Sequence, residues 1–486
     1  MRQVMKGKSI EKNYLLNLLY QILVLLVPVI TTPYVSRVLG AEGIGKYSYS
    51  YSIVSFFTIF AVLGTGNYAQ REVAYCRDNV RELSALFEEI FILRLFSTII
   101  CSAIYAFYVC VAEDRKIAIL QSAYLIAVAV DVTWFFQGLE EFKEIVTRNI
   151  LIKIVNIFAV FLLVKDKNDL NIYIGILSIL PLLGNFLVWG YLKKYIIWIP
   201  LAELKISRHI KGVIQLFIPT IAIQIYTAMD KTMIGLFTTS SVENGYYEQA
   251  ERLVRICQTF VTSLGTVMTP RIAYIYAHND KKSMLEYMRN SYRFVWFSGI
   301  PICFGLMSTI DFVVPWYLGD GFEKVQLLVK ILSFLVIIVG FSNVTGMQYL
   351  MTTQKQNILS ITVMIGAAIN FSLNCILIPA YYSVGAAIAS VIAETCITLM
   401  QFFYIVYISK EGKWRLFFSS SIHYLISGFL MMIVLAVLKG YFQTNFQGTV
   451  CMVVIGAGIY VLSLVLQKDE FMLKYGRKCI QIVLRK

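Results

Sequence analysis

The chain has little of what most enzymes use for chemistry. Its 486 residues include three histidines, His209, His278 and His423, and they stand far apart. Zinc sites bring several His or Cys ligands together at short spacing, so the sequence predicts no metal site. Neither the GxxxxGK(S/T) loop that cradles nucleotide phosphates nor the GxSxG turn of serine hydrolases occurs. We therefore predict a protein that is not an enzyme, holds no cofactor and makes no direct use of ATP.

Disulfide and thiol chemistry are equally unsupported. The nine cysteines are spread along the chain, and no CxxC pair occurs. Most of them lie within apolar runs, where a thiol packs as a small apolar side chain. An odd number also argues against a disulfide framework.

Charged residues are scarce, at 15% of the chain, while apolar residues reach 58% and the mean hydropathy is +0.69. This balance excludes an ordinary soluble globule. A helix of roughly 20 apolar residues crosses a bilayer, and about fourteen runs of that length follow one another with short connections. The sequence therefore predicts an all-α polytopic membrane protein. The predicted spans are 14–33, 47–66, 87–111, 117–137, 148–164, 171–192, 212–236, 247–269, 293–314, 326–350, 357–378, 383–408, 416–438 and 447–466.

Lysine and arginine gather in alternate connections. If the N-terminus is cytoplasmic, the loops on that side carry about 29 of them and the opposite loops about 8, which is the bias that sets orientation. We therefore predict that both termini lie in the cytoplasm. The net charge of +14 is then explained by basic loops beside anionic lipid head groups, and no nucleic-acid partner is required.

Two stretches of the chain look like copies of one another. Each is an apolar run with a proline that ends in a charged residue and a glycine, followed by a glycine–tyrosine turn; they are residues 28–49 and 219–247. A second pair, 134–143 and 347–355, occupies corresponding places in the two halves. Duplicated halves in a polytopic membrane protein are typical of a transporter.

Charges inside the membrane are the strongest pointer to a site. Each costs about 2.5–3.5 kcal/mol on insertion scales, so each needs a reason. Most of those present are basic, which favours a carrier of phosphates, because guanidinium and ammonium groups match phosphate oxygens; an exporter of cations would be lined by carboxylates. The interior charges are Arg94, Asp131, Lys153, Asp230, Lys231, Arg252, Arg255, Lys330 and Glu394.

From these charges we predict a substrate-binding set with structural alternatives for several members. Arg252 and Arg255 follow Glu248 and Glu251 by four residues, the spacing at which such side chains pair on a helix surface. That pairing is the alternative to a substrate contact. The predicted set is Arg37, Arg94, Lys153, Lys231, Arg252 and Arg255.

The other basic members also have alternatives. Arg94 and Lys153 lie near the ends of their runs, where a long side chain can extend to the head groups. Lys231 adjoins Asp230 at a helix end, and the two can act as interfacial anchors instead.

Glu394 lies about midway along its run and has no base within a turn. Such a carboxylate either pairs with a distant cation or is held protonated by the loss of its water. A protonatable carboxylate at that depth suits coupling to protons or sodium ions, and a structural hydrogen bond is the alternative. We assign Glu394 to ion coupling, with Asp131 as the second candidate.

At these residues the chain resembles the polysaccharide flippases of the Wzx type, within the multidrug/oligosaccharidyl-lipid/polysaccharide exporter superfamily. The resemblance covers nearly the whole chain and is carried by the order and spacing of short segments. They are 31–40, 45–47, 71–72, 131–140, 230–235, 245–250, 268–271 and 385–390 with Glu394.

The resemblance implies two six-helix lobes, 1–200 and 201–410, followed by a final helix pair and a basic cytoplasmic tail in 411–486. It also implies a bacterial inner-membrane protein with a cavity lined by basic residues. The implied substrate is an undecaprenyl-diphosphate-linked oligosaccharide, moved to the outer leaflet by alternating access for surface polysaccharide synthesis. Expected partners are this lipid, the membrane lipids, a coupling ion and a polymerase of the same pathway.

Two other classes remain open. A multidrug or other small-molecule antiporter of the same fold would be favoured by a cluster of acids in the membrane, and the basic excess argues against it. A membrane glycosyltransferase or polymerase of the same pathway usually needs a sizeable extramembrane loop with paired carboxylates or Arg-rich segments, and no such loop is present in the sequence.

Overall fold

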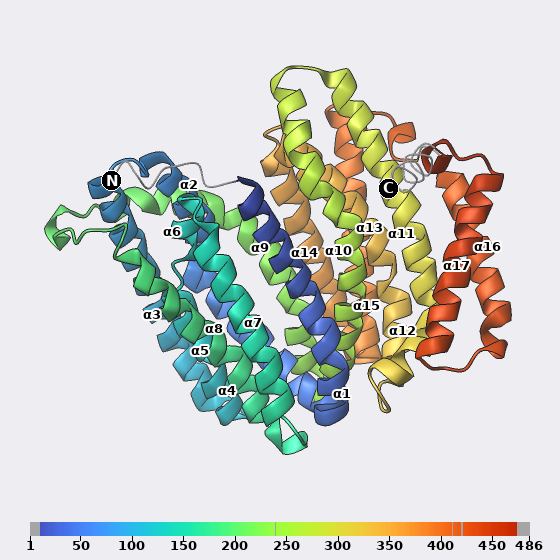
Figure 1. The fold of residues 1–486 in the computed structure, drawn as a ribbon, viewed down its shortest axis with the longest axis horizontal. Coiled ribbons are helices and arrows are strands. Elements are labelled where there is room, and N and C mark those ends of the chain that lie inside the picture. The colour runs from blue at the N-terminus through green and yellow to red at the C-terminus, as the bar shows by residue number, and fades with distance from the viewer. Residues whose placement is uncertain (1–9, 239, 411, 419–420, 474–486) are drawn as a thin grey trace. The chain divides into compact units, whose positions relative to one another are not determined.

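The helices form two compact units. A computed structural model describes residues 10–238, 240–410, 412–418 and 421–473, apart from the helix side chains of 10–23, 25, 216, 218–220 and 222–227. Its contacts divide the chain into a first unit, Met1–Gly235 with Ser240–Gly245, and a second unit, Leu236–Thr239 with Tyr246–Lys486. Within the described residues the secondary structure is entirely helical, which confirms the predicted fold class (Figure 1).

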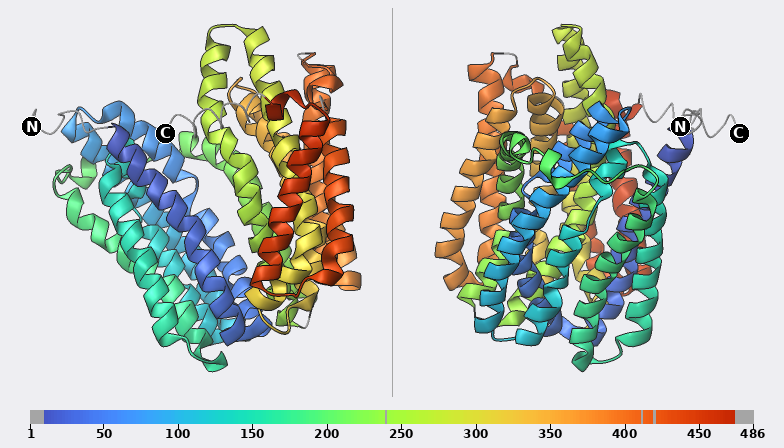
Figure 2. Two further views of the ribbon diagram at one scale, coloured as in Figure 1. Left: turned by 45° about the vertical axis from the view of Figure 1, so that its right-hand side comes forward. Right: turned by 90° about the vertical axis from the view of Figure 1, so that its left-hand side faces the viewer.

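In the first unit, α1 packs against α3 and α7, and α7 packs against α8 (Figure 2). The elements assigned to it are α1 (Ile10–Val62), α2 (Thr65–Cys76), α3 (Val80–Val111), α4 (Arg115–Gln121), α5 (Ala123–Ala129), α6 (Thr133–Gly138), α7 (Phe142–Leu163), η1 (Lys167–Asp169), α8 (Leu170–Leu192), η2 (Leu201–Glu203) and most of α9 (Ser207–Phe237).

In the second unit, α14 packs along α15, and the last two helices pack against each other and against α11. The elements assigned to it are most of α10 (Ser241–Ala277), α11 (Lys281–Tyr317), α12 (Glu323–Leu332), α13 (Phe334–Ser342), η3 (Asn343–Met351), α14 (Gln356–Tyr381), α15 (Ser383–Phe403), η4 (Tyr404–Ile408), η5 (Trp414–Leu416), α16 (Ser421–Leu438), η6 (Lys439–Tyr441) and α17 (Phe446–Leu466).

The number of membrane-spanning segments is consistent with the prediction of about fourteen. Among the described residues, 11 helical stretches are long and apolar enough to cross a membrane. One of them, Leu26–Cys76, counts twice because α1 turns back within it. Helices α9, of 31 residues, and α10, of 37, are not among the eleven but are also long enough to span at 1.5 Å per residue.

The turn within α1 explains the glycine at position 40, which ends the apolar run of the first repeated stretch. Gly40 has φ of +66°, a left-handed conformation that costs a side-chain-bearing residue free energy and costs glycine little. The chain there leaves one helix and enters the next without an intervening loop. The second repeated stretch makes its turn between α9 and α10.

The predicted glycine–tyrosine turns are wrong, since Gly45 lies within the helical part of α1 and Gly245 within α10. These two glycines touch each other within the first unit. A Cβ atom on Gly45 would lie 1.7 Å from the carbonyl oxygen of Ser241 and 2.9 Å from the backbone nitrogen of Gly245. A Cβ atom on Gly245 would lie 2.0 Å from the carbonyl oxygen of Ala41. The contact is therefore reciprocal and backbone to backbone, and it explains why both copies carry glycine at this place.

The second pair of repeated segments is irregular in both halves. In the first unit the spanning stretch breaks between α5 and α6, directly before residues 134–143. In the second unit the corresponding residues fall largely in η3, a π-helical turn that runs from Asn343 to Met351. Both departures from α-helix lie inside stretches otherwise apolar enough to span. Such departures often mark functional positions.

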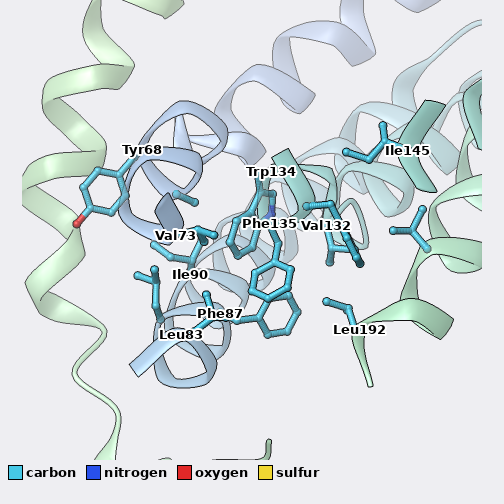
Figure 3. Packing of buried hydrophobic residues seen from close by; sticks show 14 of the residues in the cluster. Tyr68, Val73, Leu83, Phe87, Ile90, Val132, Trp134, Phe135, Ile145 and Leu192 are labelled. Atoms are coloured by element: carbon cyan, nitrogen blue, oxygen red, sulfur yellow. The ribbon is translucent and has the colours of Figure 1, made fainter. Parts of the chain in front are cut away.

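A cluster of aromatic rings packs around the break in the first unit (Figure 3). Phe87 of α3 stacks on Trp134 with ring centroids 5.6 Å apart and meets Phe135 edge to face at 5.2 Å. All three are buried. Gly138, one turn later, lets α6 approach α2 closely, since a Cβ atom there would lie 2.6 Å from that of Val73.

The terminal helix pair is tied to the rest of the second unit by charge. Asp311 of α11 accepts hydrogen bonds from Lys330 of α12 and from Lys439 of η6, the latter at the end of α16. The predicted lobe limits at residues 200 and 410 stay predictions, because contacts alone do not identify the moving bodies. The predicted basic tail falls largely outside the described residues, which end at 473.

The glycine contact makes a stability prediction. Gly45→Ala should destabilise the protein by about 1–3 kcal/mol, because the methyl group would overlap backbone atoms that cannot move aside. Gly190→Ala, where a Cβ atom meets nothing within 4 Å, is the matched control and should leave stability unchanged or raise it. Apparent Tm of the purified protein in detergent measures both, and equal values would contradict the contact.

Candidate functional site

The break between α5 and α6 exposes backbone carbonyl groups that three side chains satisfy. Asn185 Nδ2 donates to the Ala127 carbonyl oxygen at 2.6 Å, and Trp189 Nε1 donates to that of Val130 at 2.8 Å. Arg94 Nη1 donates to the carbonyl oxygen of Asp131 at 3.0 Å. In a spanning segment no bulk water can donate hydrogen bonds to these carbonyl groups. The break in the helix therefore requires the three side-chain donors.

Arg94 and Asp131 form an ion pair at the same place. Arg94 is 3% exposed, and its Nη2 lies 3.6 Å from Asp131 Oδ2. The other carboxylate oxygen, Oδ1, accepts at 3.0 Å the N–H of Thr133, the first residue of α6. Nε of Arg94 is buried and makes no hydrogen bond within the part of the chain that the structure describes. The roles predicted for this pair, substrate binding for Arg94 and ion coupling for Asp131, stay predictions; the observed contacts hold the broken helix.

A polar stripe runs along α7. Leu151, Val155, Phe158 and Leu162 are exposed along one side, as expected of a lipid-facing surface. At 3.6 residues per turn, the residues at i, i+4 and i+7 from Asn149 lie roughly half a turn away from that surface. They are Asn149, Lys153 and Asn156, and all three are half-buried. The stripe therefore faces the protein and not the lipid.

Lys153 is the charged member of this stripe. No ion pair or hydrogen bond reaches its ammonium group from the residues that the structure describes. A charge that is half-buried in a spanning helix without a protein partner is costly, and it is retained where a ligand supplies the counter-charge. Lys153 is thus the member of the predicted set whose surroundings fit an anionic ligand best.

Arg148, one residue before the stripe, was absent from the predicted set. Its guanidinium donates to the side-chain oxygens of Asn149 and Asn185. Asn185 in turn donates to Ala127, so the network joins α7 and α8 to the end of α5. The spacing of Asn149, Lys153 and Asn156 is visible in the sequence and would have identified this helix face.

The other predicted residues of the first unit, Arg37 and Lys231, lie on α1 and α9. Arg37 is exposed on α1, three residues before the turn at Gly40. Lys231 is half-buried on α9 beside Asp230, which is 5% exposed. The next residue on α9, Thr232, shares a hydrogen bond of 2.7 Å with Ser52 of α1. The structure therefore joins Arg94 to Asp131 but leaves Arg37, Lys153 and Lys231 on separate helices.

In the second unit, both predicted arginines pair within their own helix. Arg252 Nη2 lies 2.9 Å from Glu248 Oε1. Arg255 pairs with Glu251 at the same spacing of four residues. The pairing alternative is therefore confirmed for both, and their contact with a substrate stays a prediction.

Glu394 lies on α15 next to a buried polar cluster. One turn before it, Ser390 Oγ lies 3.3 Å from the Tyr247 hydroxyl and accepts from Asn370 Nδ2 at 3.5 Å. Asn374 Nδ2 donates to Asn370 Oδ1 at 3.1 Å. Glu394 itself is half-buried. The two asparagines therefore lie on one face of α14, and the coupling role of Glu394 stays a prediction.

Among the described residues, no three or more His, Cys, Asp or Glu side chains gather closely enough to hold a metal ion. The eight cysteines within those residues are free thiols.

The fold and these interior charges define a polytopic membrane protein of the transporter type, and comparison with known proteins supplies its family. The pattern of the family described as polysaccharide biosynthesis protein matches residues 10–276, more than half of the 486 residues. The chain belongs to this family, which confirms the resemblance seen in the motifs. A relative from Escherichia coli (strain K12), described as "Putative O-antigen transporter", is 22% identical over 390 residues, covering 78% of this chain and 92% of its own length.

Two solved structures are similar in fold. The lipid II flippase MurJ, in an inward closed conformation, matches with a TM-score of 0.71 and 18% identity, covering 94% of this chain and 99% of its own. An inward-facing multidrug resistance MATE family transporter of the MOP superfamily matches with a TM-score of 0.58 and 13% identity, covering 78% of this chain and 97% of its own. At these identities the likeness shows the fold.

The Arg94 contacts predict a defect of stability. Arg94→Ala would leave the Asp131 carboxylate and carbonyl without their buried donor, which costs about 3–5 kcal/mol. Arg94→Lys keeps the charge but not the paired donors, so its stability should lie between those of the wild type and of Arg94→Ala. Membrane yield and apparent Tm measure the effect. An Arg94→Ala protein of normal yield and Tm that fails in transport would show that Arg94 serves the substrate instead.

Proposed function

We propose that this protein is a flippase that moves a lipid-linked oligosaccharide, carried on undecaprenyl diphosphate, across the bacterial cytoplasmic membrane for surface polysaccharide synthesis. Membership of the polysaccharide biosynthesis family and the O-antigen transporter relative support the pathway. The observation that carries the proposal is Lys153, a cation on the protein-facing side of a spanning helix with no counter-charge among the described residues. The termini lie in the cytoplasm, and a polymerase of the same pathway receives the product.

The chemistry of that substrate explains why a transporter is required. A diphosphate and a chain of sugar hydroxyls lose their water on entering hydrocarbon, which is costly unless hydrogen bonds and charges replace it. In the proposal, Lys153 neutralises part of the diphosphate charge, and Asn149 and Asn156 offer amide groups to the remaining oxygens. The polyprenyl tail stays in lipid. The substrate group is exposed alternately to the two sides of the membrane.

Further basic residues extend the proposed site. Arg37, Lys231, Arg252, Arg255 and Arg94 are the remaining candidates from the sequence. Arg252, Arg255 and Arg94 would have to leave the carboxylates that they contact, so we rank them after Lys153.

A small-molecule antiporter of the same fold is the alternative. The similarity to the MATE family structure favours it only at the level of fold. Drug cations require carboxylates, whereas most of the interior charges here are basic. The two functions separate in one assay: purified protein in liposomes, with a fluorescent lipid-linked oligosaccharide in one arm and a lipophilic drug cation in the other. The proposal requires transbilayer movement of the first and predicts no transport of the second.

Lys153 gives the sharpest variant for that assay. Lys153→Gln should slow flipping by about tenfold or more, since a hydrogen bond to a charged group contributes about 1.5–3 kcal/mol. Lys153→Arg should retain most of the rate. Lys143→Gln, on the exposed first turn of the same helix, is the control for loss of one charge. A Lys153→Gln protein that flips as fast as the wild type would remove Lys153 from the site.

We further propose that protonation or ion binding at Glu394 drives net export. A mid-membrane carboxylate that changes charge can favour one conformation over the other. Glu394→Gln should therefore lose the acceleration that an imposed proton or sodium gradient gives to the wild type, while binding of the lipid-linked sugar persists. Flipping rates with and without each gradient decide the matter. If the wild type ignores every gradient, transport is facilitated and Glu394 has no coupling role.

A further inference from the structure

The connection between α8 and α9, residues 193–206, is fastened to α3 along one side (Figure 1, the green loop at the left edge). The backbone N–H of Ile197 donates to Ser84 Oγ, and that of Ile199 donates to Glu88 Oε1, each at 3.0 Å. Ser84 and Glu88 are one turn apart on α3, so the linker runs along that helix in an extended conformation. Its polar backbone is therefore turned toward the protein.

The end of the linker is held by the next carboxylate on α3. Glu89, 1% exposed, accepts the backbone N–H of Lys205 at 2.5 Å. Its other oxygen lies 2.6 Å from Arg208 Nη2 and 2.6 Å from His209 Nε2 in the first turn of α9. Tyr68 of α2 completes the network through a 2.9 Å hydrogen bond to His209 Nδ1. The linker and the start of α9 are thus fixed on the first unit.

The start of the linker is held by aromatic packing. The ring of Tyr195 meets those of Phe135 and Phe136 edge to face. Burial there, with Glu141 and Glu144 nearby, raises the pKa of the Tyr195 hydroxyl to about 12. The phenol therefore stays neutral at any physiological pH.

The opposite side of the same linker is apolar and uncovered. Ile197, Trp198 and Leu201 are 51%, 91% and 75% exposed, while Ile199 between them is buried. Exposed lysines at 193, 194 and 205 flank these three side chains. Ile197, Trp198 and Leu201 thus form an apolar ridge with an exposed indole and three lysines beside it. Exposure of such a ridge to water is unfavourable.

A membrane surface provides an apolar environment for this ridge and anionic groups for its lysines. Tryptophan prefers the boundary between head groups and acyl chains, where its ring is in an apolar medium and its N–H remains hydrated. Lysines beside such a ridge are attracted to anionic head groups. The linker also begins directly after Leu192, the last residue of a span, and follows α3 toward its membrane-crossing part. Position, apolar character and charge all match the lipid interface.

We propose that residues 193–206 form a lipid-interface anchor. In this arrangement Trp198, Ile197 and Leu201 insert among the head groups, and the lysines bind anionic lipid. The buried carboxylates Glu88 and Glu89 hold the backbone so that these side chains face outward. The anchor fixes the segment that joins α8 to α9 at a set depth in the membrane, independently of which substrate the protein carries.

Depth-dependent quenching tests the anchor. The full chain is reconstituted into liposomes whose lipids carry bromine either close to the head group or close to the acyl terminus. Subtracting the tryptophan emission of Trp198→Phe from that of the wild type isolates the Trp198 signal. This signal should be quenched more strongly by the shallow bromine than by the deep one, and should be largely protected from aqueous iodide. Trp198→Tyr replaces the Phe variant if the latter fails to fold.

The lysines are tested by lipid charge. Replacing Lys193 and Lys194 together by Gln should reduce shallow quenching in vesicles containing anionic phosphatidylglycerol and leave it unchanged in zwitterionic vesicles. Replacing Lys281 and Lys282 by Gln, at the start of α11, removes the same charge elsewhere and should have no effect. A Trp198 signal with water-like emission, open to iodide and untouched by either bromine, would overturn the proposal and leave the ridge to an aqueous partner.

Discussion

The fold depends on satisfying backbone groups where no water is available. A spanning helix does this within itself, but the stretch through Asp131 is broken, and the break frees carbonyl groups inside an apolar region. Arg94, Trp189 and Asn185 come from two other helices to bind those carbonyls. The aromatic cluster around Trp134 packs against the break. The broken helix, the side chains that bind its carbonyl groups and the aromatic core therefore depend on one another.

This constraint separates the interior charges into two kinds. Arg94 with Asp131, Arg252 with Glu248, and Lys330 with Asp311 have counter-charges within hydrogen-bonding or ion-pairing reach, and each pair joins or supports helices. Lys153 differs, because the described residues give it none. A transporter needs both kinds: paired charges that hold irregular helices in place, and a charge that the substrate can neutralise.

The sequence predicts local features of this fold well and long-range ones poorly. The approximate number of spans and the pairing of Arg255 with Glu251 follow from composition and from spacings of a few residues, whereas the predicted glycine–tyrosine turns are helical in the structure. The partner of Arg94 could not be found that way, since Asp131 lies 37 residues away and part of the contact is to its backbone. The contact of Gly45 with Gly245 likewise appears only once the chain has folded.

The polar stripe on α7 could have been predicted from the spacing of its residues. Asn149, Lys153 and Asn156 form a regular stripe, but counting charges alone singled out the lysine and not its helix face. The linker shows the opposite case: Trp198 and its neighbouring lysines are visible in the sequence, yet their exposure depends on Glu88 and Glu89, which lie more than a hundred residues earlier.

Cells that lack this protein test most directly whether it carries lipid-linked oligosaccharide across the membrane. With the gene deleted, the lipid-linked repeat unit should accumulate with its sugar on the cytoplasmic face, where an impermeant sugar-modifying reagent added to spheroplasts cannot reach it. Restoring the wild-type chain should make the sugar accessible again. If the reagent modifies the lipid-linked sugar equally well in cells with and without the protein, the protein does not move this lipid across the membrane.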